Sequence, residues 1–275
     1  MRESVGGEPY HRRVPLDPPI QFPTVRPGEP LTVSGTLFQT FEKCPEQAAG
    51  RLRGVYGPES RASFVGGLAH RVFARHLASG PIGEADFTAV CREEIGTSMN
   101  PKLGALGLKP SQLQQVVDEV GSLYERFRTL GAAGFEGAEV PLESEPLDGV
   151  TLRGKVDAVF GDGDAGTRLV DWKTGGLGEP ASQLGFYALL WALERGEIPG
   201  KVEAVSVSSG ERFEEIPSRA GVTEIAGRVS GMVNDLRESW DEGTDLPRVA
   251  GPWCRWCPLL DECTEGRAAK ALLDG

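Results

Sequence analysis

Segment 154–175 constrains the fold of this chain more than any other, because two strand-like alternating runs flank a Gly/Asp cluster, GDGDAG, that favours a chain reversal. The two runs cover residues 151–160 and 168–173. Side chains two apart on a strand share a face, so Asp171 and Lys173 point the same way. A turn centred on Asp164 places Asp157 across from Asp171. The sequence therefore predicts a hairpin with two carboxylates and one ammonium on one face.

This charged hairpin face has two interpretations. Like charges opposite each other destabilise a sheet, and a divalent cation between the carboxylates removes that cost, since hard cations take carboxylate oxygens. The alternative is a surface hairpin whose charged face is solvated, which is common in antiparallel sheets. The hairpin alone leaves both interpretations open.

The length and charge of the chain limit its class. A chain of 275 residues can bury a proper core as one large domain or two small ones. Its net charge of −11 argues against broad non-specific nucleic-acid binding but leaves room for a local basic groove or a metal-bridged phosphate site. We find no apolar run of about 20 residues and no apolar leader at the start, so we expect a cytoplasmic protein with no membrane contact.

The periodicity of the chain predicts a mostly helical first half followed by a sheet. Residues 1–30 are rich in Pro and Gly and predict an irregular arm outside the core, and the stretch from about 80 to 110 is polar and rich in the same residues. Ser34 can cap a short helix that ends at Cys44-Pro45. Further helices are predicted at 64–77, 111–127, 183–195 and 223–240, and strands at 139–142, 201–208 and 212–216.

The cysteines indicate a metal centre. Cys254, Cys257 and Cys263 have the spacing C-x2-C-x5-C in a short tail, and Cys44 is the best candidate for a fourth ligand. Sulfur ligands favour zinc or iron–sulfur, and chemistry alone does not choose between them. Three unrelated buried cysteines are the alternative. Cys91 lies in a helix-like run and is interpreted as a small buried hydrophobe.

Two further pairs are candidates for a site. His70 and His76 are six residues apart on one predicted helix, so they point to nearly opposite sides. His76 falls within the apolar stripe and His70 at its border, so periodicity does not favour His70. Gln183 and Tyr187 are four apart and share a helix face, where ordinary packing and capping are the alternative.

Taken together, these motifs resemble the RecB-like branch of the PD-(D/E)XK nuclease superfamily, with a four-cysteine iron–sulfur staple of the AddB type. They occur in the family's order over about residues 31–265. The matching motifs are Cys44-Pro45, GGLAH with His70, GKVD, VDWK, QLGFY and CRWCPLLDEC. The resemblance implies an α/β fold whose central mixed sheet is flanked by helices. It also implies one nuclease domain over 31–270, with a helical insertion at 80–135 and a cysteine segment at 247–265.

The resemblance also implies a role for each residue. Asp157 and Asp171 would hold Mg²⁺ or Mn²⁺, with His70 and the main-chain carbonyl of Trp172 completing the shell, and Lys173 would position or activate the attacking water. Gln183 and Tyr187 would orient the site or the DNA strand. A 4Fe-4S cluster would be held by Cys44, Cys254, Cys257 and Cys263, joining the N- and C-terminal segments.

The implied function is a metal-dependent DNA exonuclease that acts on single strands or DNA ends in repair or recombination. The chain has no P-loop motif, so any unwinding requires a helicase partner. Basic residues near the first motifs could line the path of a strand, namely Lys43, Arg51, Arg53, Arg61, Arg71 and Arg75. Two alternatives remain: a non-catalytic DNA-binding or scaffold subunit of a helicase–nuclease or CRISPR-adaptation-like complex, and a zinc-stapled protein without a nucleic-acid role.

Overall fold

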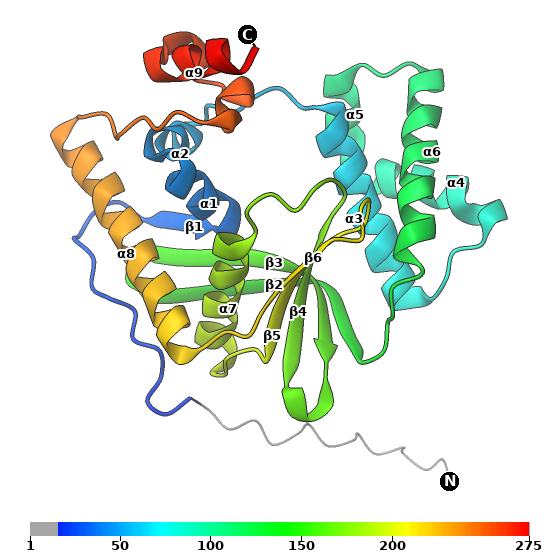
Figure 1. The fold of residues 1–275 in the computed structure, drawn as a ribbon, viewed down its shortest axis with the longest axis horizontal. Coiled ribbons are helices and arrows are strands. Elements are labelled where there is room, and N and C mark those ends of the chain that lie inside the picture. The colour runs from blue at the N-terminus through cyan, green and yellow to red at the C-terminus, as the bar shows by residue number, and fades with distance from the viewer. Residues whose placement is uncertain (1–15, 275) are drawn as a thin grey trace.

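The computed structural model describes residues 16–274, in which six strands form one mixed sheet with helices on both faces (Figure 1). The sheet order is β1-β3-β4-β5-β6, and β2 pairs with β3. The strands are β1 (Leu31–Ser34), β2 (Phe135–Leu147), β3 (Val150–Gly161), β4 (Thr167–Lys173), β5 (Lys201–Ser206) and β6 (Arg212–Glu215). The predicted α/β fold with a central mixed sheet flanked by helices is confirmed.

The central hairpin has the register that the turn predicts. Strands β3 and β4 are antiparallel, and Ala158 pairs with Val170 at the end of the ladder. Continuing this register by one residue places Asp157 across from Asp171. Beyond the hairpin, β4 runs parallel to β5, and β5 pairs antiparallel with β6.

Strand β3 is shared by three neighbours, and this creates a fork in the sheet. Strand β2 runs antiparallel along one edge of β3. On the other edge, β1 pairs with β3 from Val150 to Arg153, and β4 pairs with it from Ala158 to Gly161. Residues 154–157 therefore lie between the end of the β1–β3 ladder and the start of the β3–β4 ladder. Within the described chain, backbone groups there have no partner strand on this edge and can form hydrogen bonds with side chains. Asp157 stands at this fork.

The helices cover the sheet in two groups. Apolar side chains of α1, α7 and α8 fill one face, and those of α3, α4 and α6 fill the other (Figure 1). The helices are α1 (Gly35–Lys43), α2 (Pro45–Leu52), α3 (Arg61–Ser79), α4 (Glu84–Glu94), α5 (Asn100–Leu106), α6 (Pro110–Phe127), α7 (Ala181–Arg195), α8 (Arg219–Glu242) and α9 (Thr264–Asp274). No helix in the described part of the chain is long and apolar enough to cross a membrane.

The polar, Gly/Pro-rich stretch at about 80–110 is part of the insertion that the resemblance implies to be helical, and it contains α4, a π-helical turn at Ile95–Met99 and α5. These helices are short and bury only a few residues, so their periodicity is weak. Residues 16–30 are irregular as predicted, but they are not outside the core, since Ile20 is buried and Arg237 of α8 donates to the carbonyls of Arg26 and Glu29. The first 15 residues of the predicted arm lie outside the described part.

The C-terminal segment returns to the N-terminal helices, where α9 lies over α2 (Figure 1). The buried carboxylate of Glu46 accepts hydrogen bonds from Arg53 Nη2, at 2.6 Å, and from the backbone N–H of Leu246, at 3.0 Å. The backbone N–H of Glu46 donates to the carbonyl of Pro247. This contact brings the segment that carries three of the cysteines beside Cys44.

Candidate active site

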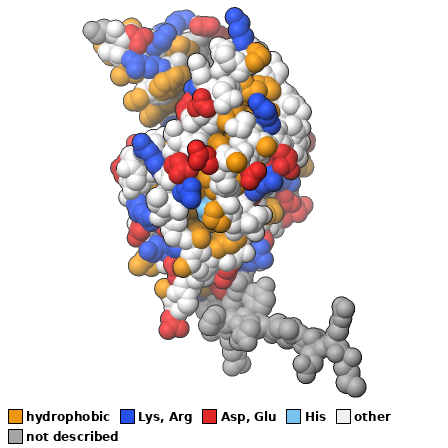
Figure 2. Space-filling view, turned by 90° about the vertical axis from the view of Figure 1, so that its right-hand side faces the viewer, with side chains coloured by type: hydrophobic (Ala, Val, Ile, Leu, Met, Phe, Trp, Pro, Cys, Tyr) orange, Lys and Arg blue, Asp and Glu red, His pale blue; other side chains and the backbone are white. Residues whose placement is uncertain are grey.

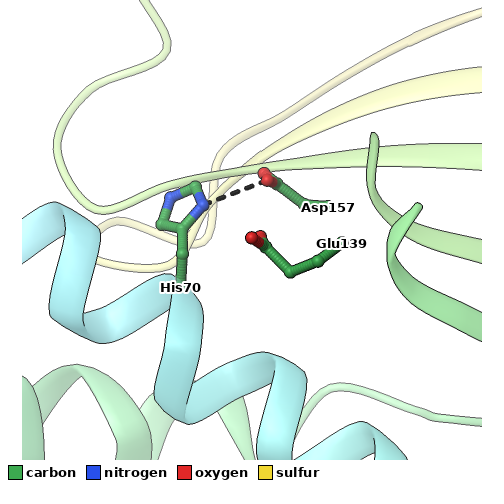
Figure 3. A group of neighbouring side chains, drawn as sticks. All are labelled: His70, Glu139 and Asp157. Carbon is green, nitrogen blue, oxygen red and sulfur yellow. Dashed lines mark hydrogen bonds and ion pairs between the residues drawn. The ribbon is translucent and has the colours of Figure 1, made fainter. Parts of the chain in front are cut away.

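Asp157 connects the sheet fork to helix α3. Its Oδ2 accepts a hydrogen bond of 2.8 Å from the backbone N–H of Trp172, so the side chain replaces the next bond of the β3–β4 ladder. Its Oδ1 lies 3.1 Å from Nδ1 of His70 on α3 (Figure 3). Burial lowers the pKa of His70, but the Asp157 carboxylate outweighs burial and raises it above its ordinary value. The predicted ligands His70 and Asp157 are thus in contact.

Glu139, which the sequence analysis missed, completes a group of three. Ligand atoms of His70, Glu139 and Asp157 all lie within 4.8 Å of one another (Figure 3). Within residues 16–274, no other set of three or more His, Cys, Asp or Glu side chains is this close. The sequence predicted a strand from residue 139, but its register against β3 could not be read from the pattern. The position of Glu139 opposite Asp157 was therefore not available.

The backbone explains how these side chains reach α3. Val156 packs among the apolar side chains on the face covered by α1, α7 and α8 (the α7/α8 cluster). Ala158, two residues later, packs among those on the face covered by α3, α4 and α6 (the α3/α6 cluster). Residues two apart on a regular strand would share a face, so the pleat changes phase at Asp157. On β2, Glu139 has φ +52°, a left-handed conformation that is uncommon for a side chain other than Gly. Such strained conformations concentrate at functional sites.

A second group of side chains joins β4 to α7. Gln183 Nε2 donates to Asp171 Oδ1 at 3.0 Å and to the hydroxyl of Tyr187 at 3.0 Å. Gln183 Oε1 accepts from Lys173 Nζ at 2.7 Å, and the same ammonium lies 2.8 Å from Asp171 Oδ2. All four predicted residues are therefore in one hydrogen-bonded group. A side chain at Gly154 would meet Leu190 at 3.0 Å and Tyr187 at 3.3 Å, so this glycine lets α7 approach β3.

Asp171 has a raised pKa, because the nearby Lys173 does not fully offset the effects of burial and of the Asp157 carboxylate. Burial raises its pKa to about 6, the Asp157 carboxylate adds to the rise, and Lys173 opposes it. Burial and the same two carboxylates also raise the pKa of Tyr187, so its hydroxyl stays protonated. A cation at this point would stabilise the ionised form of Asp171.

The backbone of Trp172 faces the fork. The carbonyl of Lys173 accepts from the N–H of Val207 beyond β5. Successive residues on a strand direct their backbone groups to opposite sides, so those of Trp172 point toward β3. The indole ring packs on the α3/α6 side, with its centroid 5.2 Å from that of Phe127. A ligand role for the Trp172 carbonyl stays a prediction.

Helix α3 presents its two histidines to different neighbours. A side chain at Gly66 would lie 3.2 Å from Thr174 Oγ1, so the GGLAH motif permits close packing of α3 on the segment after Lys173. His76 Nδ1 is 2.9 Å from the hydroxyl of Tyr124, and its ring packs edge-on to Phe127. His76 is thus half-buried against Tyr124 and Phe127, at the border of the core in which the sequence places it.

The cysteine staple is not confirmed. All five cysteines are free thiols, and no three of them in the described chain have sulfurs within 4.8 Å of one another. The C-terminal segment does contact Cys44, whose sulfur accepts a hydrogen bond of 3.5 Å from the backbone N–H of Val249. Burial raises the pKa of Cys257. Cys91 is fully buried in the α3/α6 cluster, as predicted.

The basic residues near the first motifs divide into two sets. Arg53, Arg61 and Arg75 form ion pairs with acidic side chains. Lys43, Arg51 and Arg71 have no acidic partner within the described range. Figure 2 shows Lys and Arg interspersed with Asp and Glu, without a continuous basic patch on this face. Between α3, α6 and the segment after β4, a groove of about 380 Å³ is lined by Ala62, Val65, Glu119, Ser122, Leu123, Arg126, Thr174, Gly175 and Ser208.

Comparison with protein families decides the class of this fold. The family model for the PD-(D/E)XK nuclease superfamily matches residues 32–264. The chain belongs to the PD-(D/E)XK nuclease superfamily. No curated protein is similar enough in sequence to match it.

One solved structure supports the same fold. The crystal structure of a protein described as a candidate exonuclease from Eubacterium rectale aligns with a TM-score of 0.54 at 13% identity, over 83% of this chain and 86% of that chain. The structure of SSO0001 covers 87% of this chain and 88% of its own at 16% identity, with a TM-score of 0.39. At these identities, the first likeness concerns the fold, and the second score is too low to support an argument.

Proposed function

We propose that this superfamily member is a metal-dependent deoxyribonuclease, an exonuclease that hydrolyses phosphodiester bonds in single-stranded DNA or at DNA ends. One observation carries the proposal: His70, Glu139 and Asp157 converge at the sheet fork, beside a lysine that is held by a second carboxylate. The RecB-like branch, repair or recombination as the pathway, and a helicase partner belong to the same proposal and rest on the sequence resemblance.

The donor set fits a divalent cation. Carboxylate and carbonyl oxygens suit Mg²⁺ or Mn²⁺, and Oδ2 of buried Asp171, which the Lys173 ammonium approaches to 2.8 Å, accepts no hydrogen bond of regular geometry. His70, Glu139 and Asp157 would hold the ion, with Asp171 and the Trp172 carbonyl as further donors at the same fork. Bound there, the ion would generate a nucleophilic hydroxide from water and offset negative charge on the phosphate.

The remaining residues would position the reacting groups. Lys173 is held between Asp171 and Gln183, so its ammonium has a fixed place from which it can donate to water or to a phosphate oxygen. Tyr187 fixes Gln183 in turn. A non-catalytic scaffold would gain nothing from these buried carboxylates, because burying charge is costly without a function or a partner.

The substrate is proposed from the surface around the site. The groove beside Thr174 and Gly175, which directly follow Lys173 in the chain, contains Arg126. With a net charge of −11 and interspersed surface charges, the chain would hold nucleic acid by a few local contacts and not by a broad basic face. This supports a strand that enters through the groove and not a duplex that lies along the surface.

We also propose that Cys44, Cys254, Cys257 and Cys263 hold a 4Fe-4S cluster. Backbone N–H groups donate to the sulfurs of Cys44, Cys254 and Cys263 at 3.5, 3.4 and 3.2 Å, and hydrogen bonds to sulfur are one means by which proteins tune such clusters. Thiolates suit both zinc and iron–sulfur, so the choice of a 4Fe-4S cluster rests on the sequence resemblance.

The test is cleavage of end-labelled DNA. Single- and double-stranded DNA and single-stranded RNA are incubated with Mg²⁺ or Mn²⁺ and with wild type, Lys173→Ala or Lys270→Ala. Lys270 lies on α9 and serves as an exposed lysine control. We expect cleavage of single-stranded DNA that requires the metal, is lost in Lys173→Ala and is unchanged in Lys270→Ala. Equal cleavage by both variants, or none by wild type with any substrate, would refute the proposal.

A further inference from the structure

Lys155 is a basic side chain in contact with Glu139 that the proposed chemistry leaves unused. It lies on β3 two residues before Asp157, and its backbone pairs with Pro141. From there it reaches diagonally along β2 and forms an ion pair with Glu139 Oε2. Its side chain is 52% exposed, whereas that of Glu139 is 25% exposed. The ammonium therefore lies at the solvent-facing edge of the candidate metal site.

The Glu139 carboxylate cannot serve Lys155 and a divalent ion equally well. The ligand atoms of Glu139, His70 and Asp157 lie within 4.8 Å of one another, so an ion bound among them would share the carboxylate that Lys155 holds. A divalent ion at that place would repel the ammonium and weaken its ion pair. Lys155 thus occupies Glu139 in the metal-free protein, and the two cations compete for one ligand.

We propose that Lys155 is a metal-released phosphate contact. Without a divalent ion its ammonium is held on Glu139; with the ion bound, it turns outward and contacts a phosphate of the nucleic-acid strand beside the site. This inference rests on the proposed function, because the phosphate belongs to the proposed substrate. Lysine suits the role, since it binds phosphate as a mobile point charge on a flexible stem.

The same side chain then links metal loading to substrate binding. A strand that arrives before the metal finds Lys155 engaged with Glu139, whereas a strand that arrives after it finds a free ammonium. Metal and strand should therefore bind with positive coupling, and each should raise the affinity for the other by the same factor. The part of this coupling that Lys155 carries should be lost when it is replaced by a neutral residue, so the coupling should weaken.

The first measurement is Mn²⁺ binding without nucleic acid, followed by electron paramagnetic resonance, for wild type, Lys155→Ala and Lys201→Ala. Lys201 is a matched control, because it forms a strand-to-strand ion pair with Glu214 at the far end of the sheet. We expect Lys155→Ala to bind Mn²⁺ about two- to fivefold more tightly, which corresponds to loss of one exposed ion pair. Unchanged or weaker Mn²⁺ binding by Lys155→Ala would overturn the competition and with it the inference.

The second measurement is anisotropy of a labelled single-stranded oligonucleotide over a range of salt, with Ca²⁺ as a non-cleaving ion or with EDTA. Loss of one phosphate contact lowers the slope of log K against log salt by about 0.7 for a single strand. We expect this change for Lys155→Ala in Ca²⁺ only, and recovery of the wild-type slope in Lys155→Arg. The same loss in EDTA and in Ca²⁺ would overturn metal release.

The two proposals fail in different ways. Metal-dependent cleavage by wild type together with unchanged Mn²⁺ binding by Lys155→Ala would overturn only the role of Lys155. Absence of binding and cleavage by wild type on every nucleic acid would overturn the proposed function and the phosphate contact, even where Mn²⁺ binding by Lys155→Ala is tighter.

Discussion

Glu139 on β2 lies directly across from Asp157 on β3, because the pairs Ala138–Ala158 and Val140–Val156 enclose them. The two carboxylates come from adjacent strands and meet the same histidine ring on α3. Like charges placed opposite each other destabilise a sheet, and the left-handed backbone of Glu139 adds a further cost. Lys155 offsets part of the charge of Glu139, and the proposed divalent ion would offset the remainder.

The first prediction follows from this pair. Glu139→Gln keeps the shape of the side chain but removes its charge, so Mn²⁺ affinity should fall by about tenfold or more and metal-dependent cleavage should fall with it. Glu143→Gln is the control, since Glu143 lies on the same strand and pairs with Arg153 at the surface. Calorimetric titration of metal-free protein measures the affinity. Wild-type Mn²⁺ binding by Glu139→Gln would remove Glu139 from the site.

The second prediction concerns the stability of the metal-free protein against pH. The raised pKa of Asp171, about 6 against an unfolded value of 3.8, means that the folded state binds this proton more tightly. Stability from this group is therefore present at low pH and is lost as pH rises from about 4 to 6, by up to about 3 kcal/mol. Asp171→Asn removes the titration. It should be more stable than wild type at pH 7.5, and about two-thirds of that difference should be gone at pH 4.5.

Urea unfolding in EDTA at the two pH values checks this expectation. Asp118→Asn, at an exposed position of α6, controls for the loss of one carboxylate. An Asp171→Asn protein that is less stable than wild type at pH 7.5 would show that Lys173 and Gln183 already balance the charge.

Asp157→Ala and Asp171→Ala should both remain folded yet lose cleavage.

The sequence predicts those features that depend on local pattern. The register of the β3–β4 hairpin follows from one turn, and the long helices α3, α6, α7 and α8 follow from strong apolar periodicity. Within the site, the same local patterns predict the arrangement of two pairs. Asp171 and Lys173, two apart, share a strand face, and Gln183 and Tyr187, four apart, share a helix face. These four side chains form one hydrogen-bonded group in the structure.

Features that depend on distant pairing were not predictable. The place of Glu139 requires the β2–β3 register and a positive φ, and neither has a signature in the sequence. The short helices α4 and α5 gain their stability from packing against α3 and not from their own periodicity. Ile20 is buried by contacts with residues far along the chain, so an irregular segment rich in proline gave no sign of its burial.

The third prediction separates the two histidines of α3. His70→Ala should lose metal-dependent cleavage with little change in melting temperature, because His70 contacts Asp157 at the edge of the site. His76→Ala should retain cleavage and lose about 1–3 kcal/mol of stability, since it removes a hydrogen bond to Tyr124 and packing against Phe127. Thermal unfolding and cleavage are measured on the same preparations. Loss of cleavage in a folded His76→Ala protein, with activity kept by His70→Ala, would reverse the assignment.

The fourth prediction concerns the cysteines. Replacing Cys44, Cys254, Cys257 or Cys263 by Ser should each give colourless, poorly soluble protein, because a metal centre that the unfolded chain cannot bind stabilises only the folded state. Cys91→Ser should remain coloured, since burial raises the pKa of the Cys91 thiol to about 12 and a protonated thiol is a poor ligand. The measurements are visible absorbance and the iron, sulfide and zinc content of anaerobically prepared protein. Zinc in place of iron would leave the staple but change its metal. A colourless, soluble, metal-free wild type would overturn the staple, and protein contacts such as those of Glu46 would then hold the C-terminal segment to α2.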